Sequence, residues 1–150
     1  MITYQVEPWP NVLPEMQKLW PDHWEEVALN KDEIKLKPDL DGYAKIHAEG
    51  MLHVLVVREK GALIGYHVSI IKRHLHYADT LHAFVDMYFI AKHKRKGMVG
   101  VALFTRAEAA LRARGVKKII QATKLHLNMS RIFERLGYVH VEHVFTKYIG

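Results

Sequence analysis

Apolar residues recur along the chain with regular spacing, and the spacing predicts a sheet flanked by helices. Strand-like runs, rich in β-branched and aromatic residues and bounded by turn residues, occupy residues 2–6, 51–58, 62–73, 81–91, 116–123 and 138–148. Helical spacing of three and four residues marks residues 39–49, 101–114 and 129–136. Pro14 and Pro21 are typical of first helical turns, so we expect two short helices at residues 15–20 and 22–29 with a break between them.

The connections between these elements indicate how the sheet is built. Tight turns at residues 59–61 and 77–80 predict antiparallel neighbours. The helix before residues 116–123 makes that strand a parallel neighbour of residues 81–91. No repeat, low-complexity tract or linker divides the sequence. We therefore expect a single domain over residues 1–150 with an α/β (α+β) fold: a mixed, mostly antiparallel sheet with one parallel strand pair and helices on both faces.

The most informative stretch is a basic, glycine-containing turn between an apolar strand and an amphipathic helix. Its sequence is Arg95-Lys96-Gly97-Met98-Val99-Gly100. Backbone N–H groups in a first helical turn lack partners inside the helix, and the helix dipole adds partial positive charge there. Glycine lets the backbone approach a ligand because no Cβ intervenes. The pattern predicts a binding site for the diphosphate of a phosphorylated cofactor.

Composition narrows the classes of protein. The chain has 150 residues, 49% of them hydrophobic, and the lack of cysteine excludes a disulfide scaffold, a thiolate nucleophile and a zinc–thiolate site. It contains no apolar run long enough to span a membrane and no signal-peptide pattern, so we expect a cytoplasmic protein. The net charge of +6 indicates an anionic partner. Basic residues gather between residues 92 and 118 and acids in the N-terminal part, which suits an anionic cofactor and a cationic substrate, although solvated surface charge explains the same residues.

Three motifs and the order of the elements together point to a known family. Ile90-Ala91-Lys92-His93-Lys94-Arg95 is similar to a V-x-P-x-x-R segment, and residues 95–103 are similar to R-x-x-G-x-G/A followed by x-A-L. The stretch Arg131-Ile132-Phe133-Glu134-Arg135-Leu136-Gly137-Tyr138 is similar to an x-L-Y-E-K-L-G-F junction between a helix and a strand. Over nearly its whole length the sequence thus resembles the GNAT superfamily of N-acetyltransferases.

Two positions depart from the family pattern. Gly100 falls on the second glycine of the loop, but Met98 occupies the first, and Gly97 comes one residue early, so the loop could have a shifted backbone. Phe133 stands where many members carry a tyrosine proposed to protonate the leaving thiolate, and phenylalanine cannot donate a proton. That role therefore falls to another group, to water, or to none.

The resemblance implies direct transfer of an acetyl group from acetyl-CoA to a primary amine. A base must remove the proton of the ammonium, and a backbone N–H must polarise the thioester carbonyl. In this family that N–H lies on the strand before the loop, at a bulge where the strand splays from its parallel neighbour. The cofactor contacts implied here are Met87, Phe89, Ile90, Arg95, Lys96, Gly97, Met98, Val99, Gly100, Val101, Ser130, Arg131 and Phe133.

Asp86, Tyr88 and Tyr138 are the candidate catalytic residues. Asp86 lies in an apolar strand, where acids are scarce, on the face expected for Tyr88 and Ile90, and the family often places its catalytic carboxylate about here. It could act as base or hold a water, but an exposed or salt-bridged strand-end aspartate explains it equally well. Either tyrosine could replace the missing acid, although core packing is the more frequent use of a strand tyrosine.

Four residues are candidate acceptor contacts. His23 and Glu26 lie in the early helical segment, which in this family typically overhangs the acceptor site; a solvated helix face is the alternative. His74 and His76 share a strand face near His82 and could line an acceptor pocket. A metal site there is conceivable, but we expect none, because neighbouring histidines are more often coincidental in a chain with 11 of them.

Two further functions stay open. Phe133 makes a non-catalytic acyl-CoA-binding module on the same fold credible. The basic residues 92–96 could bind nucleic acid, but we favour CoA, whose diphosphate and ribose phosphate occupy several such charges. The acceptor is expected to be a small-molecule or peptide amine that the sequence does not identify, and a homodimer is conceivable because dimers are common on this fold.

Overall fold

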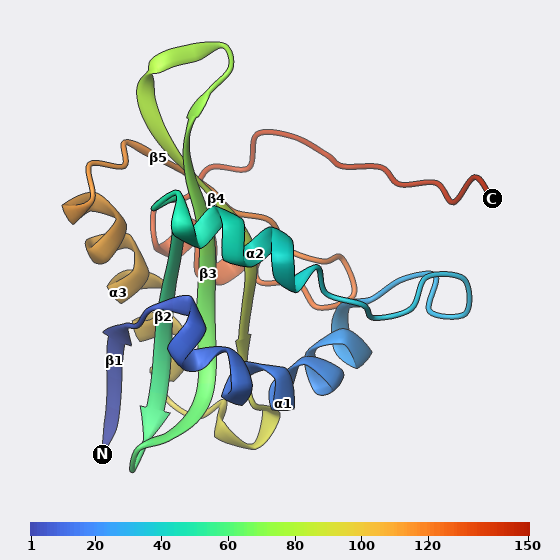
Figure 1. Cartoon of the computed structure of the whole chain (residues 1–150), viewed down its shortest axis with the longest axis vertical. Helices are drawn as coiled ribbons and strands as arrows, with labels where there is room; N and C mark the ends of the chain where they lie inside the picture. Colours follow the sequence, from blue (N-terminus) through green and yellow to red (C-terminus); the bar gives the residue numbers. More distant parts are fainter.

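Five strands form one mixed sheet in the order β1-β2-β3-β4-β5 (Figure 1). The computed structural model describes all residues from 1 to 150. Neighbouring strands are antiparallel throughout, except that the last strand runs parallel to β4. The strands are β1 (Ile2–Val6), β2 (Leu52–Glu59), β3 (Ala62–His74), β4 (Tyr77–Ile90) and β5 (Lys118–Ile120). The prediction of a mostly antiparallel sheet with one parallel pair is confirmed.

Helices cover both faces of the sheet. One face carries α1 (Trp9–Val27) and α2 (Leu40–Ala48), and the other carries α3 (Val99–Ala113) and the short α4 (Ser130–Arg135). Successive residues of a strand point to opposite faces, so each strand contributes to two apolar layers. The layer under α1 contains Trp9, Val12, Met16, Trp20, Val54, Val56, Tyr66, Val68 and Phe89. The layer under α3 contains Leu55, Val57, Ile64, Ile90, Val99, Leu103 and Ala107.

The N-terminal helix is continuous, so the predicted break between two short helices is wrong. Pro14 and Pro21 both lie inside α1, although each removes a backbone N–H donor from the helix. The helix buries Trp9 at its start and Trp20 in its second half, with Val12 and Met16 at helical spacing between them. Burial of this stripe against the sheet offsets the lost hydrogen bonds.

The predicted final strand at residues 138–148 is also absent. This segment extends away from the sheet (Figure 1), and its side chains are exposed, as at Phe145 with 91% of its surface accessible. Alternation of apolar and polar residues suits a strand, but a strand also needs a partner. None of the backbone groups of residues 139–150 takes part in a backbone hydrogen bond.

The β3–β4 hairpin is longer than predicted. Its turn falls at Leu75 and His76, not at residues 77–80, which continue the ladder with Tyr77 opposite His74. The hairpin therefore projects beyond the body of the sheet (Figure 1). None of the helices is both long and apolar enough to cross a membrane.

Candidate functional site

The loop that joins β4 to α3 contains the backbone conformation that its glycine suggests. After Ile90 the chain makes one 3₁₀ turn at Lys92–Lys94 and then reaches Gly97, whose φ of 55° lies in the left-handed region. Met98 has an ordinary φ of −96°. The glycine that seemed displaced in the sequence thus stands where the left-handed conformation occurs, and Met98 needs no such freedom.

The start of α3 presents unpaired backbone N–H groups. The amides of Gly97, Met98, Gly100 and Val101 donate to no backbone or side-chain acceptor within the protein. Apart from its own chain neighbours and the adjoining helix backbone, no atom lies within 4 Å of a Cβ built on Gly100, so there is open space beside this residue. Four free donors at the N-terminus of a 15-residue helix suit a bound anion, and the residues present therefore fit the diphosphate of a CoA-type cofactor.

Two cations of the basic run are already paired within the protein. Lys94 forms an ion pair with Glu59, and Arg95 Nη2 lies 2.6 Å from Glu26 Oε2. Arg95 Nε also donates to the backbone oxygen of Ile90 at 2.7 Å. Fewer of these charges are therefore free for an anion than the sequence alone suggested.

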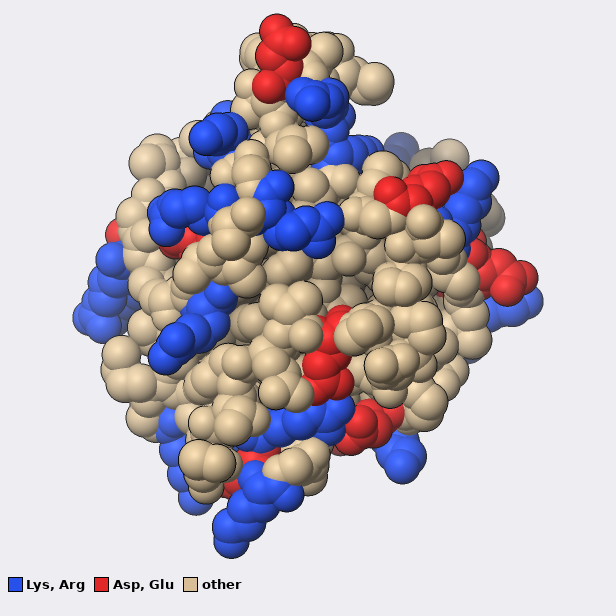
Figure 2. All heavy atoms as spheres, turned by 60° about the vertical axis from the view of Figure 1, so that its left-hand side comes forward, with Lys and Arg blue, Asp and Glu red and all other residues tan.

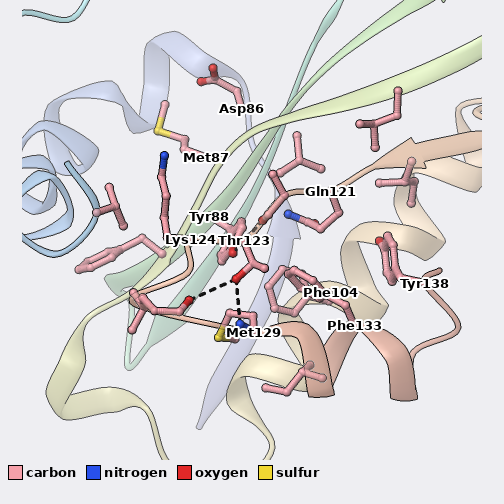
Figure 3. A pocket seen from close by; sticks show the side chains of 18 of the residues that line it. Asp86, Met87, Tyr88, Phe104, Gln121, Thr123, Lys124, Met129, Phe133 and Tyr138 are labelled. Carbon is pink, nitrogen blue, oxygen red and sulfur yellow. Dashed lines mark hydrogen bonds between the residues drawn. The ribbon is translucent and has the colours of Figure 1, made fainter. Parts of the chain in front are cut away.

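Beside this loop, β4 and the following chain separate. β5 pairs with β4 only from His82 to Phe84. Farther along, the contact between the two is a side-chain bond from the Tyr88 hydroxyl to the Ala122 oxygen at 3.0 Å. The edge of β4 from residue 87 to Ile90 thus has no strand partner on this side. A cavity of about 2190 Å³ extends along this edge and reaches both faces of the sheet (Figure 3).

Asp86 occupies a β-bulge in β4. Val68 pairs with Met87 and Ser69 pairs with Val85, so Asp86 is the extra residue of the bulge. The bulge reverses the alternation of faces, and the expectation that Asp86 shares a face with Tyr88 is wrong. Tyr88 contacts the α3 layer, whereas Asp86 accepts a hydrogen bond from Tyr43 on the α2 side.

Tyr43 is the site residue that sequence reasoning missed. Its hydroxyl donates to Asp86 Oδ2 at 2.5 Å, and its ring stacks on Trp9 at a centroid distance of 4.4 Å. Burial and the contact with Asp86 both raise the pKa of Tyr43, so the phenol stays protonated and donates. The sequence places Tyr43 in a helix but gives no signal that this helix lies against β4.

Phe133 belongs to an aromatic cluster on the α3 side. Its ring meets Phe104 edge to face at 5.0 Å, and Tyr88 and Tyr138 lie at 6.0 and 5.5 Å. Burial raises the pKa of Tyr88, and it raises that of Tyr138 to about 12. Both phenols are therefore protonated at neutral pH, and only the Tyr88 hydroxyl has a hydrogen-bond partner. Figure 3 shows this cluster at the opposite end of the cavity from Asp86 and Met87.

His23 and Glu26 lie on the α1 side of the same cavity. The His23 ring stacks on Phe89 at 4.9 Å, and its Nδ1 lies 2.8 Å from the Tyr66 hydroxyl. Burial lowers the pKa of His23 to about 4, so the imidazole is neutral at pH 7. The structure thus brings both predicted acceptor contacts to the cavity, with Glu26 bound to Arg95.

Of the other two predicted acceptor contacts, His74 also lines this cavity, at its far end, and His76 does not. His74 is opposite Tyr77, at the far end of β4 from Ile90, and His76 is in the turn of the projecting hairpin. The structure does not bring them to Asp86. Their rings lie 5.1 Å apart, but no group of three or more His, Cys, Asp or Glu side chains is arranged to hold a metal ion.

The start of α4 lies at one side of the cavity. Ser130 is the first helical residue, and its N–H donates to the side-chain oxygen of Asn128, two residues earlier, at 2.8 Å. Thr123 Oγ1 accepts from Met129 N and donates to the Leu127 oxygen (dashed lines in Figure 3). These bonds link residues within the 123–129 loop, which lines the cavity.

Basic side chains do not form a continuous surface on the face shown in Figure 2. They lie there in separate groups with acidic side chains between them. A nucleic-acid-binding face would be expected to show a connected basic stripe.

Comparison with known proteins gives one family. The sequence model of the acetyltransferase (GNAT) family matches residues 9–138. No curated protein matches the chain by sequence. The fold is similar to an aminoglycoside acetyltransferase from an uncultured soil metagenomic sample, with a TM-score of 0.75 and 16% identity over 100% of this chain and 99% of the other.

Two further solved structures are similar. A ribosomal-protein-alanine N-acetyltransferase from Brucella melitensis biovar Abortus gives a TM-score of 0.72 and 16% identity, with all of both chains covered. A protein of Clostridium acetobutylicum, described as a predicted acetyltransferase, was solved with acetyl-CoA. It gives a TM-score of 0.70 and 12% identity, with 99% of this chain and 96% of the other covered. The family match spans most of the sequence, and these neighbours have a fold similar to that of this protein: the chain belongs to the GNAT acetyltransferase family.

Proposed function

We propose that this protein moves an acetyl group from acetyl-CoA to a primary amine by direct transfer. The observation that carries the proposal is the row of unpaired amides at the start of α3, placed beside the open edge of β4. A structural neighbour was solved with acetyl-CoA, which supports the same cofactor here. When bound, acetyl-CoA would supply an activated thioester.

The cofactor would be held along the open edge of β4 and the start of α3. The free amides of Gly97, Met98, Gly100 and Val101 would bind the diphosphate, together with the Arg95 and Lys96 side chains. The edge of β4 from Met87 through Phe89 to Ile90 would align the pantetheine arm. The backbone groups that face away from β3 on this edge are those of Tyr88 and Ile90, because the Ala91 N–H donates to the Ile64 oxygen on the β3 side and successive residues alternate. On the other side of the gap, Phe133 would face the arm, and Ser130 and Arg131 would contact the adenosine part of the cofactor.

The acceptor would enter from the α1 and α2 side. Asp86 takes the proton of the ammonium, directly or through a water, while the Tyr43 hydroxyl holds one carboxylate oxygen and leaves the other free. A backbone N–H between residues 87 and 90 donates to the carbonyl oxygen as it gains charge.

The departing sulfur would receive its proton from the α3 side. Tyr138 is the preferred donor because its hydroxyl has no partner in the protein and its ring lies beside Phe133. The Tyr88 hydroxyl already donates to Ala122, so it is the second candidate. Base and acid thus lie on opposite faces of the sheet, with the reacting groups in the gap between them.

The experiment is an acetylation assay on an amine panel, with Asp86→Asn and Tyr138→Phe alongside the wild type. The panel contains an aminoglycoside, a polyamine and a peptide with an N-terminal alanine, since two structural neighbours are named for the first and last acceptor classes. Both variants should lower turnover by about 100-fold, a typical contribution of general acid–base catalysis, and still bind acetyl-CoA. Asp79→Asn, an exposed strand residue, is the matched control.

One rival function has a specific observation behind it. Phe133 is buried among aromatic rings and offers no proton donor, as a non-catalytic acyl-CoA-binding module would allow. Tight acetyl-CoA binding with no acetylation of any amine, and no effect of Asp86→Asn, would favour that module over the enzyme.

A further inference from the structure

Arg95 connects the proposed cofactor site with the proposed acceptor site. Its Nη2 is bound to Glu26 and its Nε to the Ile90 oxygen, while its Cζ lies over the Phe89 ring at 5.4 Å. The first unpaired amide, that of Gly97, follows two residues after Arg95. The Arg95 guanidinium can therefore bind the Glu26 carboxylate on the acceptor side or a diphosphate at the amide loop.

Glu26 occupies an unfavourable place for an acid. It lies in the last turn of α1, where the helix dipole is negative, and Arg95 is its ion-pair partner. Its backbone oxygen accepts a hydrogen bond from His126 Nε2 at 2.8 Å, so the main chain here is tied to the 123–129 loop. Only 23% of the Glu26 side-chain surface is exposed, against 70% for its neighbour Glu25.

We propose that Glu26 holds Arg95 in the cofactor-free protein and loses it to the cofactor's diphosphate, so that Glu26 couples cofactor binding to acceptor binding. This inference rests on the proposed function. Glu26 and the diphosphate are both anions, and both compete for one guanidinium at the edge of the amide loop. A diphosphate binds a guanidinium through charge-assisted, bidentate hydrogen bonds, which favours the exchange.

The exchange would change the acceptor side of the cavity. Glu26 then presents an unpaired carboxylate in the same cavity as Asp86 and the neutral His23 ring. An acceptor ammonium would meet this second negative charge only after the cofactor has bound. The ion pair thereby favours binding of the cofactor first and of a cationic acceptor second.

The experiment measures CoA binding by calorimetry to the wild type, Glu26→Gln, Arg95→Ala and the double variant. Glutamine keeps the shape of the side chain and removes its charge, so Glu26→Gln should bind CoA about three to ten times more tightly, as expected for a partly exposed ion pair. In the Arg95→Ala background the same change should have a much smaller effect. Higher salt should reduce the gain, because both charges are partly exposed to solvent.

Glu25→Gln is the matched control. It removes the same charge from the residue next to Glu26, and Glu25 pairs with Lys31 and not with Arg95. It should change CoA affinity less than twofold. Unchanged CoA affinity in Glu26→Gln would overturn the competition, and weaker binding would show that Glu26 instead orients Arg95 for the cofactor. Failure of CoA to bind the wild type would refute the proposed function itself, a result distinct from either.

Discussion

At the scale of single residues, the candidate site depends on one inserted residue in a strand. An acid in an apolar strand drew attention to Asp86 from sequence alone. The family resemblance implied a bulge in this strand, but not that Asp86 is the extra residue and that its side chain turns toward α2. One extra residue reverses every later side-chain direction, and nothing in the local pattern marks it. Tyr43 was missed for a related reason, since its role depends on packing between segments far apart in the sequence.

The hydrogen bond between Tyr43 and Asp86 should matter for turnover and little for folding. Tyr43→Phe keeps the ring that stacks on Trp9 and removes the hydroxyl, so the carboxylate loses the group that orients it. We expect turnover of an accepted amine to fall about tenfold, a size typical of one hydrogen bond to a charged group. The acetyl-CoA dissociation constant and the unfolding temperature should stay close to those of the wild type.

Steady-state kinetics and calorimetry on the same preparations measure both quantities. Tyr77→Phe, in the exposed hairpin, is the control. Equal turnover in Tyr43→Phe and wild type would show that Asp86 needs no orienting partner.

At the scale of elements, the regular spacing of apolar residues predicted most of the helices and strands. It failed where contacts with distant parts of the chain determine whether an element forms. The predicted bounds of β1 are those of the structure, and the predicted bounds of α2 differ from the observed ones by one residue at each end. Pro14 and Pro21 suggested a break, but the apolar stripe of α1 holds the helix together across them. The last predicted strand has the right alternation and no neighbouring strand.

The C-terminal segment gives an element-scale prediction. Because residues 139–150 make no backbone hydrogen bonds, their amide protons should exchange with solvent as fast as in an unfolded peptide. Amides of β2 and β3, which pair along their lengths, should be protected and serve as the internal reference. Hydrogen-exchange mass spectrometry of overlapping peptides measures this directly. Protection of residues 139–148 would mean that the segment pairs as a strand in solution.

At the scale of the whole molecule, buried histidines link stability to pH. His53 and His67 are each 1% exposed in the layer under α3, and His23 is largely buried under α1. Burial lowers the pKa of all three to about 4. The unfolded chain takes up these protons near pH 6.5, whereas the folded protein does so only near 4, so folding is favoured most above pH 6.5.

The free energy of unfolding should therefore fall as the pH drops from 6.5 toward 4. Each histidine contributes at most about 1.4 kcal/mol per pH unit to this fall in the free energy of unfolding. His53→Leu removes one of these titrating groups, so the free energy of unfolding should depend less steeply on pH. The substitution should lower stability little at pH 7, because neither ring nitrogen of His53 has a hydrogen-bond partner that would be lost. Urea unfolding at a series of pH values tests this, with an unchanged slope in His53→Leu as the contrary result.

The arrangement of the whole sheet explains how two ligands could meet. The layer under α1 and α2 carries Asp86 and Glu26, the layer under α3 carries the aromatic cluster, and β4 separates from the following chain between them. The amide loop lies at the end of β4 and the start of α3, next to this opening. The glycine-containing turn was readable from sequence, but the two-sided opening requires the complete sheet.

The central claim is that the start of α3 binds the diphosphate of acetyl-CoA, and Gly100 offers the most direct test. A Cβ built at this position meets no other part of the protein within 4 Å, and we expect a valine side chain there to crowd a diphosphate bound to the neighbouring free amides. Calorimetric titration of acetyl-CoA into the wild type and Gly100→Val, with unfolding temperatures measured in parallel, separates binding from folding. We predict binding to the wild type, at least a tenfold loss in Gly100→Val, and an unfolding temperature that is unchanged or higher, because valine costs a helix less than glycine does. Equal affinity in the two proteins, or no binding to the wild type, would contradict this account.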